Sequence, residues 1–518
     1  MAARQVPRPR PCVRRPGRWR RQLRQSTAVL APLALVVLGL TAAPAGTAAA
    51  APPPSPPAVV TAQQSAQQDV PALAGSEPDT LVEPDVAVSP QDDRVAVAVA
   101  HDGRYPDGGA VGISYSWTAD GGQTWHPHPL PGVTSTTGGE ARWARASDPV
   151  AAFDSDGRAY VSTLLFNTGC DSGVAVSRST DGGRTFGRPV LVHSSDTCAV
   201  SEDKNWLVVD TAAGSPHRGR VYQFWTPFLT DPFGGADGSP QAVAWSDDQG
   251  RTWSPPVNVS APHANTQNSQ PMLLRDGTIV DSYIDFGDEA AEEGPEAAQA
   301  RHARRLPPPA VAAQVQGPTL LTRISRDGGR TWTDGGVITR DLSAGPPGIR
   351  CCLPSATADP VSGRMYATWS GIDPRRLLLA TSKDGVNWSE ERRINRDSGD
   401  VLGVNADVSA YNSVMAVSYG LTNPDNGQGR FARQLVVTSR DAGAHFSTPV
   451  VVGPRIDYAF AAQARGIFPG DYIGTAMRGT VLYAVWCVST RPDRAGARFH
   501  QVEYAARLDT RSGLRRRS

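Results

Sequence analysis

The chain alternates short apolar stretches with polar turns, and one pair of such stretches recurs seven times along it. The first stretch of a pair follows a polar start, as in "EPDVAV" (83–88) and "DPVAAFD" (148–154), and the second follows after a short turn. Brief apolar runs bounded by Gly, Pro and Asp are typical of β-strands. The seven first stretches are 83–88, 148–154, 203–210, 269–277, 354–360, 405–411 and 471–477. We therefore expect an all-β chain.

One turn sequence, which ends in an aromatic residue, occurs six times with small changes. It reads "SWTADGGQTW" (116–125), "SRSTDGGRTF" (177–186), "AWSDDQGRTW" (244–253), "RISRDGGRTW" (323–332), "TSKDGVNW" (381–388) and "TSRDAGAHF" (438–446). Its Asp positions are 120, 181, 248, 327, 384 and 441, which gives a period of roughly 60 residues, typical of a propeller or array. Ser, Thr and Asp side chains can bond the turn's own backbone, Gly supplies positive φ, and the aromatic ring can pack between sheets. We interpret the turn as structural.

These units predict a single β-propeller of four-stranded blades. We count seven blades, with a six-bladed propeller as the alternative. The seventh unit has a third strand near 500–508 but no turn, and a segment such as 57–63 could supply its missing strand and close the ring.

The N-terminus reads as an export signal. Nine Arg and no acid occupy the first 25 residues, and an apolar run (27–46) and Ala-rich sites follow. The alternative is a membrane anchor, but Pro32 and Pro44 interrupt the run. We expect a signal peptide at 1–50, a Pro/Ala/Gln-rich linker at 51–79 that can contain the closing strand, the propeller at 80–508 with an inserted loop at 287–318, and a basic tail at 509–518. The mature protein is then secreted and extracellular, with no stable membrane anchor.

The net charge of the mature chain limits the classes of molecule that it can bind. All 50 acids follow residue 60 and nine of the 51 bases lie in the head, so the mature chain has 42 bases against 50 acids, a net charge near −8. Nucleic acid is therefore excluded as a partner, and we expect a monomer.

An exported chain can form disulfides, and Cys170–Cys198 is the first expected pair. Cys351 and Cys352 could bond to each other, or one of them to Cys487.

The six turns resemble the Asp boxes, or BNR repeats, of sialidases and related propellers, over roughly residues 80–508. The resemblance implies that the repeated turns lie on the face opposite the pocket. The pocket is then built from the starts of the first strands and from the loops between second and third strands. These segments supply a polar rim of Glu83, Asp85, Asp148, Glu202, Asp203, Lys204, Gln270, Asp407, Asp471, Tyr472, His101, Asp102, Arg104, Tyr105, Asp107, Arg350, Arg375, Arg376, Arg465 and Arg491.

The resemblance also implies roles. "GDYIGTAMRGTVLYAVW" (470–486) is similar to the family's nucleophile strand and gives Tyr472 that role. "AHDGRYPDGG" (100–109) matches the acid/base loop, with Asp102 as the first choice and Asp107 as the second. Arg375 or Arg376 occupies a position of the arginine clamp that binds the substrate carboxylate.

The chain departs from that family at the other clamp positions. "LVEPDVAV" has an acid where the first clamp arginine is usual, Asn268 or Ser269 stands at the place of the glutamate that assists the tyrosine, and Asp285 lies near the second clamp position. Arg104, Arg350 and Arg465 are candidates to replace the clamp, and Glu202 to activate Tyr472. We expect Asp148, Asp203, Gln270 and Asp471 to contact the substrate.

Two hypotheses follow. The first is a sialidase-like (exo-α-sialidase-like) glycoside hydrolase that acts on terminal sugars of a glycan or glycoconjugate with retention. The second is a non-catalytic propeller that binds a glycan, a peptide or Ca²⁺, the last through Glu83, Asp85, Asp148 and Asp471. No cofactor is expected besides this possible Ca²⁺.

Overall fold

The computed structural model describes residues 54–287, 317–343, 345–395, 401–422 and 429–511. The expected signal peptide, most of the 287–318 insertion and most of the basic tail lie outside the described residues. Within them the regular elements are β-strands and two short 3₁₀ turns, η1 (Ser135–Thr137) and η3 (Tyr458–Phe460), so the fold class is all-β as expected. No helix among the described residues is long and apolar enough to cross a membrane.

The described strands form one eight-stranded and five four-stranded sheets, and every strand is antiparallel to its neighbours. The eight-stranded sheet contains β2 (Leu81–Val88), β3 (Ala96–Arg104), β4 (Ala110–Thr118), β5 (His126–Pro129), β6 (Arg145–Phe153), β7 (Ala159–Phe166), β8 (Ser172–Ser179) and β9 (Val190–Ser195). Its two halves, β2–β5 and β6–β9, are joined through a single pair, Ala110 with Ala146.

Three four-stranded sheets follow in chain order. They contain β10 (Val200–Val209), β11 (Val221–Leu229), β12 (Ala242–Ser246) and β13 (Val257–Asn258); β14 (Thr266–Leu273), β15 (Ile279–Asp285), β16 (Thr319–Ser325) and β17 (Thr333–Thr339); and β18 (Ser355–Ala358), β19 (Met365–Ser370), β20 (Leu377–Ser382) and β21 (Arg392–Arg393).

The last two sheets complete the described chain. They contain β22 (Leu402–Tyr411), β23 (Val414–Thr422), β24 (Phe431–Ser439) and β25 (Val450–Asp457); and β26 (Gly474–Arg478), β27 (Val481–Ser489), β28 (Gln501–Asp509) and β1 (Ala58–Ala66). The N-terminal strand β1 pairs with β28, so the final sheet combines both ends of the described chain.

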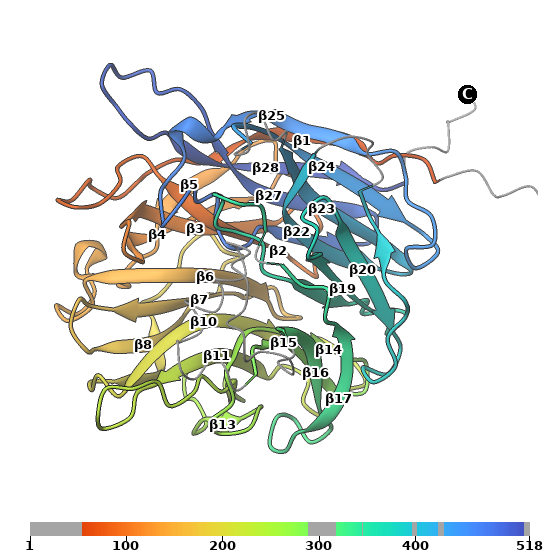
Figure 1. Ribbon diagram of the computed structural model, residues 1–518, viewed down its shortest axis with the longest axis horizontal. Helices are drawn as coiled ribbons and strands as arrows, with labels where there is room; N and C mark the ends of the chain where they lie inside the picture. The colour runs from red at the N-terminus through yellow and green to blue at the C-terminus, as the bar shows by residue number, and fades with distance from the viewer. Residues whose placement is uncertain (1–53, 288–316, 344, 396–400, 423–428, 512–518) are drawn as a thin grey trace, which may run out of the picture. The chain divides into compact units, whose positions relative to one another are not determined.

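The first strands of the successive units contact one another in chain order, from β2 through β6, β10, β14, β18 and β22 to β26. The strand β26 then contacts β2, so the series of contacts returns to its start. Figure 1 labels five of these strands, β2, β6, β10, β14 and β22, and they lie in this order around a common centre. The arrangement of the sheets is therefore propeller-like, and the starts of the first strands meet near that centre.

The repeated turns hold neighbouring sheets together. In the third turn the Asp248 carboxylate accepts hydrogen bonds from the backbone N–H groups of Arg251 (3.0 Å) and Thr252 (2.8 Å) and from the Ser246 hydroxyl (2.8 Å). Trp332, which ends the fourth turn, packs edge-to-face against Phe224 of the preceding sheet, with ring centroids 6.0 Å apart. The turn is thus structural, closed by its own aspartate and anchored by its aromatic ring.

Strand register places the turns and the first-strand starts at opposite ends of the sheets. Ala96 pairs with Val88 at the end of β2 and with Thr118 at the end of β4, directly before the first turn. Glu83 lies at the other end of β2, where Leu81 pairs with Asp102. We call the end with the repeated turns the turn face and the opposite end the mouth.

Two disulfides are present in the described chain. Cys170 is bonded to Cys198, and Cys351 to its neighbour Cys352, while Cys487 is a buried free thiol. The second arrangement is one of the two that the sequence left open.

Candidate functional site at the mouth

A repeated backbone irregularity opens the first strands at the mouth. Glu83, Asp148, Lys204, Asn268 and Asn405 have φ values of +53°, +48°, +45°, +68° and +39°. Each lies where the pairing between the first and second strand of its unit shifts register. Cys352 (φ +84°) and Gly470 (φ +108°) lie just before β18 and β26. We call these seven the entry residues. Six of them carry a side chain in a backbone region that favours Gly, so the surrounding structure must hold the backbone in this conformation.

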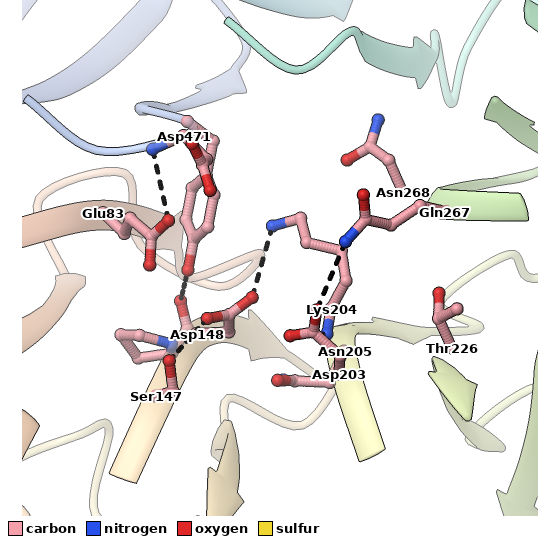
Figure 2. A network of polar contacts seen from close by, with 12 residues as sticks. Glu83, Ser147, Asp148, Asp203, Lys204, Asn205, Thr226, Gln267, Asn268 and Asp471 are labelled. Carbon is pink, nitrogen blue, oxygen red and sulfur yellow. Dashed lines mark hydrogen bonds and ion pairs between the residues drawn. The ribbon is translucent and has the colours of Figure 1, made fainter. Parts of the chain in front are cut away.

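Three entry residues converge with His101 of β3 and with Tyr472, which precedes β26. His101 Nε2 lies 2.9 Å from Glu83 Oε2 and 3.7 Å from Asp148 Oδ1, and Lys204 Nζ lies 3.7 Å from Asp148 Oδ2. Figure 2 shows Glu83, Asp148 and Lys204 close to one another, with the Lys204 ammonium directed toward Asp148. We call Glu83, His101, Asp148, Lys204 and Tyr472 the mouth cluster; each is at most 7% exposed.

Tyr472 reaches across the centre to the opposite strands. Its hydroxyl donates to the Pro149 carbonyl at 3.1 Å, its ring packs edge-to-face on Trp206 at 5.7 Å, and the Lys204 ammonium lies 3.8 Å from its ring centroid. Burial raises the pKa of Tyr472 well above its usual value, and the charges of Glu83 and Asp148 raise it further. Tyr472 is therefore a neutral phenol in a negatively charged surrounding.

The carboxyl groups near Tyr472 have pKa values shifted in opposite directions. Burial favours the neutral form of Asp148, but the Lys204 ammonium and His101 outweigh it and lower the Asp148 pKa. For Asp85, burial raises the pKa to about 7 and the charge of Asp407 adds to it, although the Ala151 N–H donates at 2.8 Å and Lys204 opposes the shift. For His101, burial opposes the charge, but Glu83 and Asp148 outweigh it and raise the pKa. The mouth thus places Asp148, which stays ionised, near Asp85, which is protonated at mildly acidic pH, and such a pair of shifted pKa values suits acid–base chemistry.

Two of the predicted arginines meet on one ring beside this cluster. The guanidinium of Arg104 lies 4.2 Å from the Phe468 ring centroid, and that of Arg350 lies 5.1 Å from it. Arg350 Nη2 also donates to Asp471 Oδ2 at 3.2 Å, and the Asp471 N–H donates to Glu83 Oε1 at 3.2 Å. Arg104, Arg350 and Asp471 therefore border the mouth cluster, as the sequence suggested.

The vicinal disulfide supports the loop that carries Tyr472. The backbone N–H groups of Cys352 and Leu353 both donate to the Asp471 carbonyl, at 3.1 and 3.0 Å. The Cys352 N–H also donates a hydrogen bond to the side-chain oxygen of the entry residue Asn405, at 2.7 Å. The Cys351–Cys352 segment thus fixes the backbone next to Tyr472.

Two residues that were given catalytic roles have other partners. Asp102 follows His101 in β3 and so points to the other face of that strand. Its carboxylate accepts from the backbone N–H of Asp69 at 2.8 Å and from the Ser114 hydroxyl, and burial raises its pKa to about 7. Glu202 has a fully buried side chain bonded to His193 Nδ1 at 2.7 Å, and it is not among the charges that shift the pKa of Tyr472. Glu83 occupies the position beside Tyr472 that Glu202 was expected to fill.

The remaining predicted contacts are dispersed. Arg376 donates to Asp341 at 3.0 Å, and Arg375 pairs with Asp373 at 3.4 Å, both on the loop side of β20 and about two-fifths exposed. Asp203 accepts from the Gln267 side chain at 3.2 Å, near Lys204 in Figure 2. Gln270 is buried and faces the Ala356 backbone of the next sheet at 3.5 Å, a link between sheets.

The charge balance of the mouth cluster bears on the metal hypothesis. Glu83, His101 and Asp148 could offer three ligand atoms within 4.8 Å of one another. However, the Asp148 amide nitrogen lies 2.5 Å from His101 Nε2, which blocks the approach of an ion to that nitrogen, and Lys204 faces the same carboxylate. Asp471 likewise faces Arg350. These acids are neutralised by the protein's own cations, so the donor set fits Ca²⁺ poorly.

A polar cavity of about 260 Å³ lies at the turn face, lined by residues that include Asp154, Arg158, His217, Arg220 and Asp247. Arg220 binds Asp247 through two hydrogen bonds of 2.7 and 2.8 Å, and Arg158 pairs with Asp154 at 3.1 Å. Because these groups bind each other, we place the functional site at the mouth.

The sequence placed His101 and Lys204 at the rim without a role, and it did not single out Asn405. The signal was available in the first-strand starts: when the units are aligned, Glu83, Asp148, Lys204, Asn268 and Asn405 occupy one position. These five residues are all polar but differ in type, which indicates that the backbone conformation is the same in each unit while the side chain varies.

No family model and no curated protein matches the sequence. Among solved structures, the chain is similar to the Hadza microbial sialidase Hz136 (14% identity, 88% of this chain and 98% of that chain, TM-score 0.45). It is also similar to an α-L-arabinanase of Penicillium chrysogenum complexed with arabinobiose (12% identity, 77% and 99%, TM-score 0.44). A third is a leech intramolecular trans-sialidase (12% identity, 70% and 67%, TM-score 0.43).

Proposed function

We propose that the protein is a secreted, sialidase-like glycoside hydrolase that cleaves a terminal sugar from a glycan with retention of configuration. We also infer that its domain is a seven-bladed Asp-box propeller, in which the eight-stranded sheet supplies two blades and β1 completes the last. The observation that carries the proposed activity is the position of Tyr472, a phenol held among carboxyl groups whose pKa values are shifted apart.

In the proposed reaction Tyr472 Oη attacks the anomeric carbon and its proton passes to Glu83. Asp85, protonated below about pH 7, donates its proton to the leaving oxygen. Water then hydrolyses the covalent glycosyl–tyrosine bond, with Asp85 taking the proton of the water and Glu83 returning its proton to the released Tyr472 oxygen, so that two inversions give net retention. Asp148 stays ionised and stabilises positive charge that develops on the sugar ring.

The test is turnover of a panel of aryl glycosides, including sialosides, arabinofuranosides and neutral hexosides, by the mature protein. Tyr472→Phe should lower kcat on the order of 10³-fold on the accepted substrate. Tyr483→Phe is the matched control, because Tyr483 is also buried and also donates to one carbonyl, that of Asp93 at 3.0 Å. Early product should have the anomeric configuration of the substrate. Full activity in Tyr472→Phe, or inverted product, would refute the assignment.

A second candidate is a non-catalytic propeller that binds a glycan at the mouth. It is favoured by the hydrogen bond that already engages the Tyr472 hydroxyl and by the separation of Arg375 and Arg376 from the cluster. Sugar binding without turnover of any glycoside in the panel would select this candidate.

A further inference from the structure

Lys204 is chemically exceptional in this chain. The sequence has 51 Lys and Arg residues, of which only two, Lys204 and Lys383, are lysines. Arginine is therefore the chain's usual cation, and a lysine at an entry position indicates a need for a compact ammonium rather than a planar guanidinium.

The ammonium of Lys204 is buried without a hydrogen-bond acceptor. Its side chain is 4% exposed, and no acceptor lies within hydrogen-bond distance of Nζ among the described residues. Its neighbours are the Tyr472 ring at 3.8 Å, the Trp206 ring at 5.6 Å and Asp148 Oδ2 at 3.7 Å. A buried ammonium with three unused N–H donors is costly, which indicates that a bound oxygen satisfies it.

A buried acceptor without a donor lies at a neighbouring entry position. Asn268 donates through its amide nitrogen to the Pro354 carbonyl at 2.9 Å, but its amide oxygen has no partner. Asn268 lies in β14, which packs against β10, the strand of Lys204, and Figure 2 shows the Lys204 ammonium directed toward Asp148. The ligand must therefore both accept and donate hydrogen bonds, as hydroxyl groups do.

The surrounding charge favours a neutral ligand. A carboxylate that approached Lys204 would also approach Asp148 and Glu83, whereas a hydroxyl can accept from the ammonium and donate to Asp148. The 3.7 Å gap between Lys204 Nζ and Asp148 Oδ2 is too long for a direct hydrogen bond but allows one oxygen to contact both. Trp206, partly exposed beside Tyr472, offers an aromatic face to a sugar ring.

We propose that Lys204, Asp148 and Asn268 bind adjacent hydroxyl groups of a neutral sugar, with Lys204 as the residue that determines specificity. This inference rests on the proposed glycan-binding function of the same mouth, and it predicts discrimination against acidic sugars.

The experiment compares wild type, Lys204→Met and Lys204→Arg with Lys383→Met, the matched control at the chain's only other lysine, which lies in a repeated turn. Saturation-transfer NMR and calorimetry would measure binding of methyl glycosides of neutral hexoses and pentoses, of glucuronic acid and of sialic acid. We expect neutral glycosides to bind wild type and Lys383→Met equally, and Lys204→Met at least tenfold more weakly. Lys204→Arg should also bind more weakly, which keeps the test valid if Lys204→Met does not fold.

The outcomes separate the two proposals. Neutral-sugar binding that depends on Lys204 without turnover would support this inference and refute the hydrolase. Turnover with an unchanged KM in both Lys204 variants would refute this inference and leave the hydrolase standing. Preference for glucuronic or sialic acid, or binding of no glycoside, would overturn the inference.

Discussion

The turn face and the mouth both repeat a backbone conformation, but only the turn face repeats its side chains. In the turns, Asp120, Asp181, Asp248, Asp327 and Asp441 each accept backbone N–H groups of their own loop, as Asp384 does. The side chain creates the conformation there and cannot vary. At the mouth a register shift between first and second strands accompanies the conformation in five units, and the entry residue there is Glu, Asp, Lys or Asn. A repeat with invariant side chains stabilises the fold, and a repeat with varied side chains supplies a site.

The sharpest test of this comparison uses one glycine from each face. A Cβ on Gly470 would lie 2.7 Å from the Glu83 backbone nitrogen, whereas a Cβ on Gly250 would meet nothing closer than 3.7 Å. We expect Gly470→Ala to lower the free energy of unfolding by about 2–4 kcal/mol and to abolish activity, because the loop before Tyr472 must move. Gly250→Ala should cost about 1 kcal/mol through its positive φ and leave kcat unchanged. Urea unfolding and the glycosidase assay check both; equal activity loss in the two variants would contradict the division.

The two disulfides should separate stability from activity. Joint replacement of Cys170 and Cys198 by Ala opens a loop with a sequence separation of 28 and should cost about 3 kcal/mol without changing kcat. Joint replacement of Cys351 and Cys352 opens no loop, so unfolding should change little, while kcat/KM falls several-fold because the Asp471 carbonyl loses its fixed donors. Denaturation and steady-state kinetics on the two double variants measure this. Unchanged kinetics in the Cys351/Cys352 variant would show that the segment does not position Tyr472.

Removal of one turn carboxylate should affect stability alone. Asp248→Ala deletes the acceptor of two backbone N–H groups and two hydroxyls and should cost about 1–2 kcal/mol, with activity unchanged. Asp248→Asn retains an acceptor oxygen and should cost less. Thermal unfolding of the two variants gives the difference, and a loss of glycosidase activity in either would mean that the turn face takes part in function.

The two faces should respond to pH with opposite sign. Burial opposes ionisation of Asp248, but the bonds from Thr252 and Ser246 outweigh it and lower the pKa to about 2, so its contribution to stability is lost as the pH falls from about 4 toward 2. The Asp281 carboxylate accepts a hydrogen bond at 2.6 Å from the hydroxyl of Ser269, the residue that follows the entry residue Asn268. Burial raises the pKa of Asp281 to about 8. The unfolded chain releases that proton near pH 4, so the stability associated with Asp281 declines as the pH rises from about 4 to 8.

Melting temperatures at pH 3, 5 and 8 test this prediction. The advantage of wild type over Asp248→Asn should shrink at pH 3, whereas Asp281→Asn should gain on wild type between pH 5 and 8. Parallel pH curves for wild type and Asp281→Asn would show that Asp281 titrates normally.

The sequence by itself determined the all-β class, the repeated turns and their structural role, and the position of each first strand. All of these depend on bonds within a few neighbouring residues: a Ser or Thr, an Asp and a Gly close each turn wherever they occur together, and apolar stretches of strand length then pair with their neighbours. It also placed Tyr472, Asp148, Asp471, Arg104 and Arg350 at the mouth, because their place in the repeat sets the end of the sheet at which they lie.

The tertiary structure alone decided which of these residues meet. Glu83 and Tyr472 are almost 400 residues apart and become neighbours only because β26 packs against β2. The choice of His101 over Asp102, and of Glu83 over Glu202, depends on which face of a strand points to the centre and on a register shift that turns the entry residues inward. Such choices depend on packing between sheets, and the pattern along the sequence does not specify which residues of other sheets lie nearby.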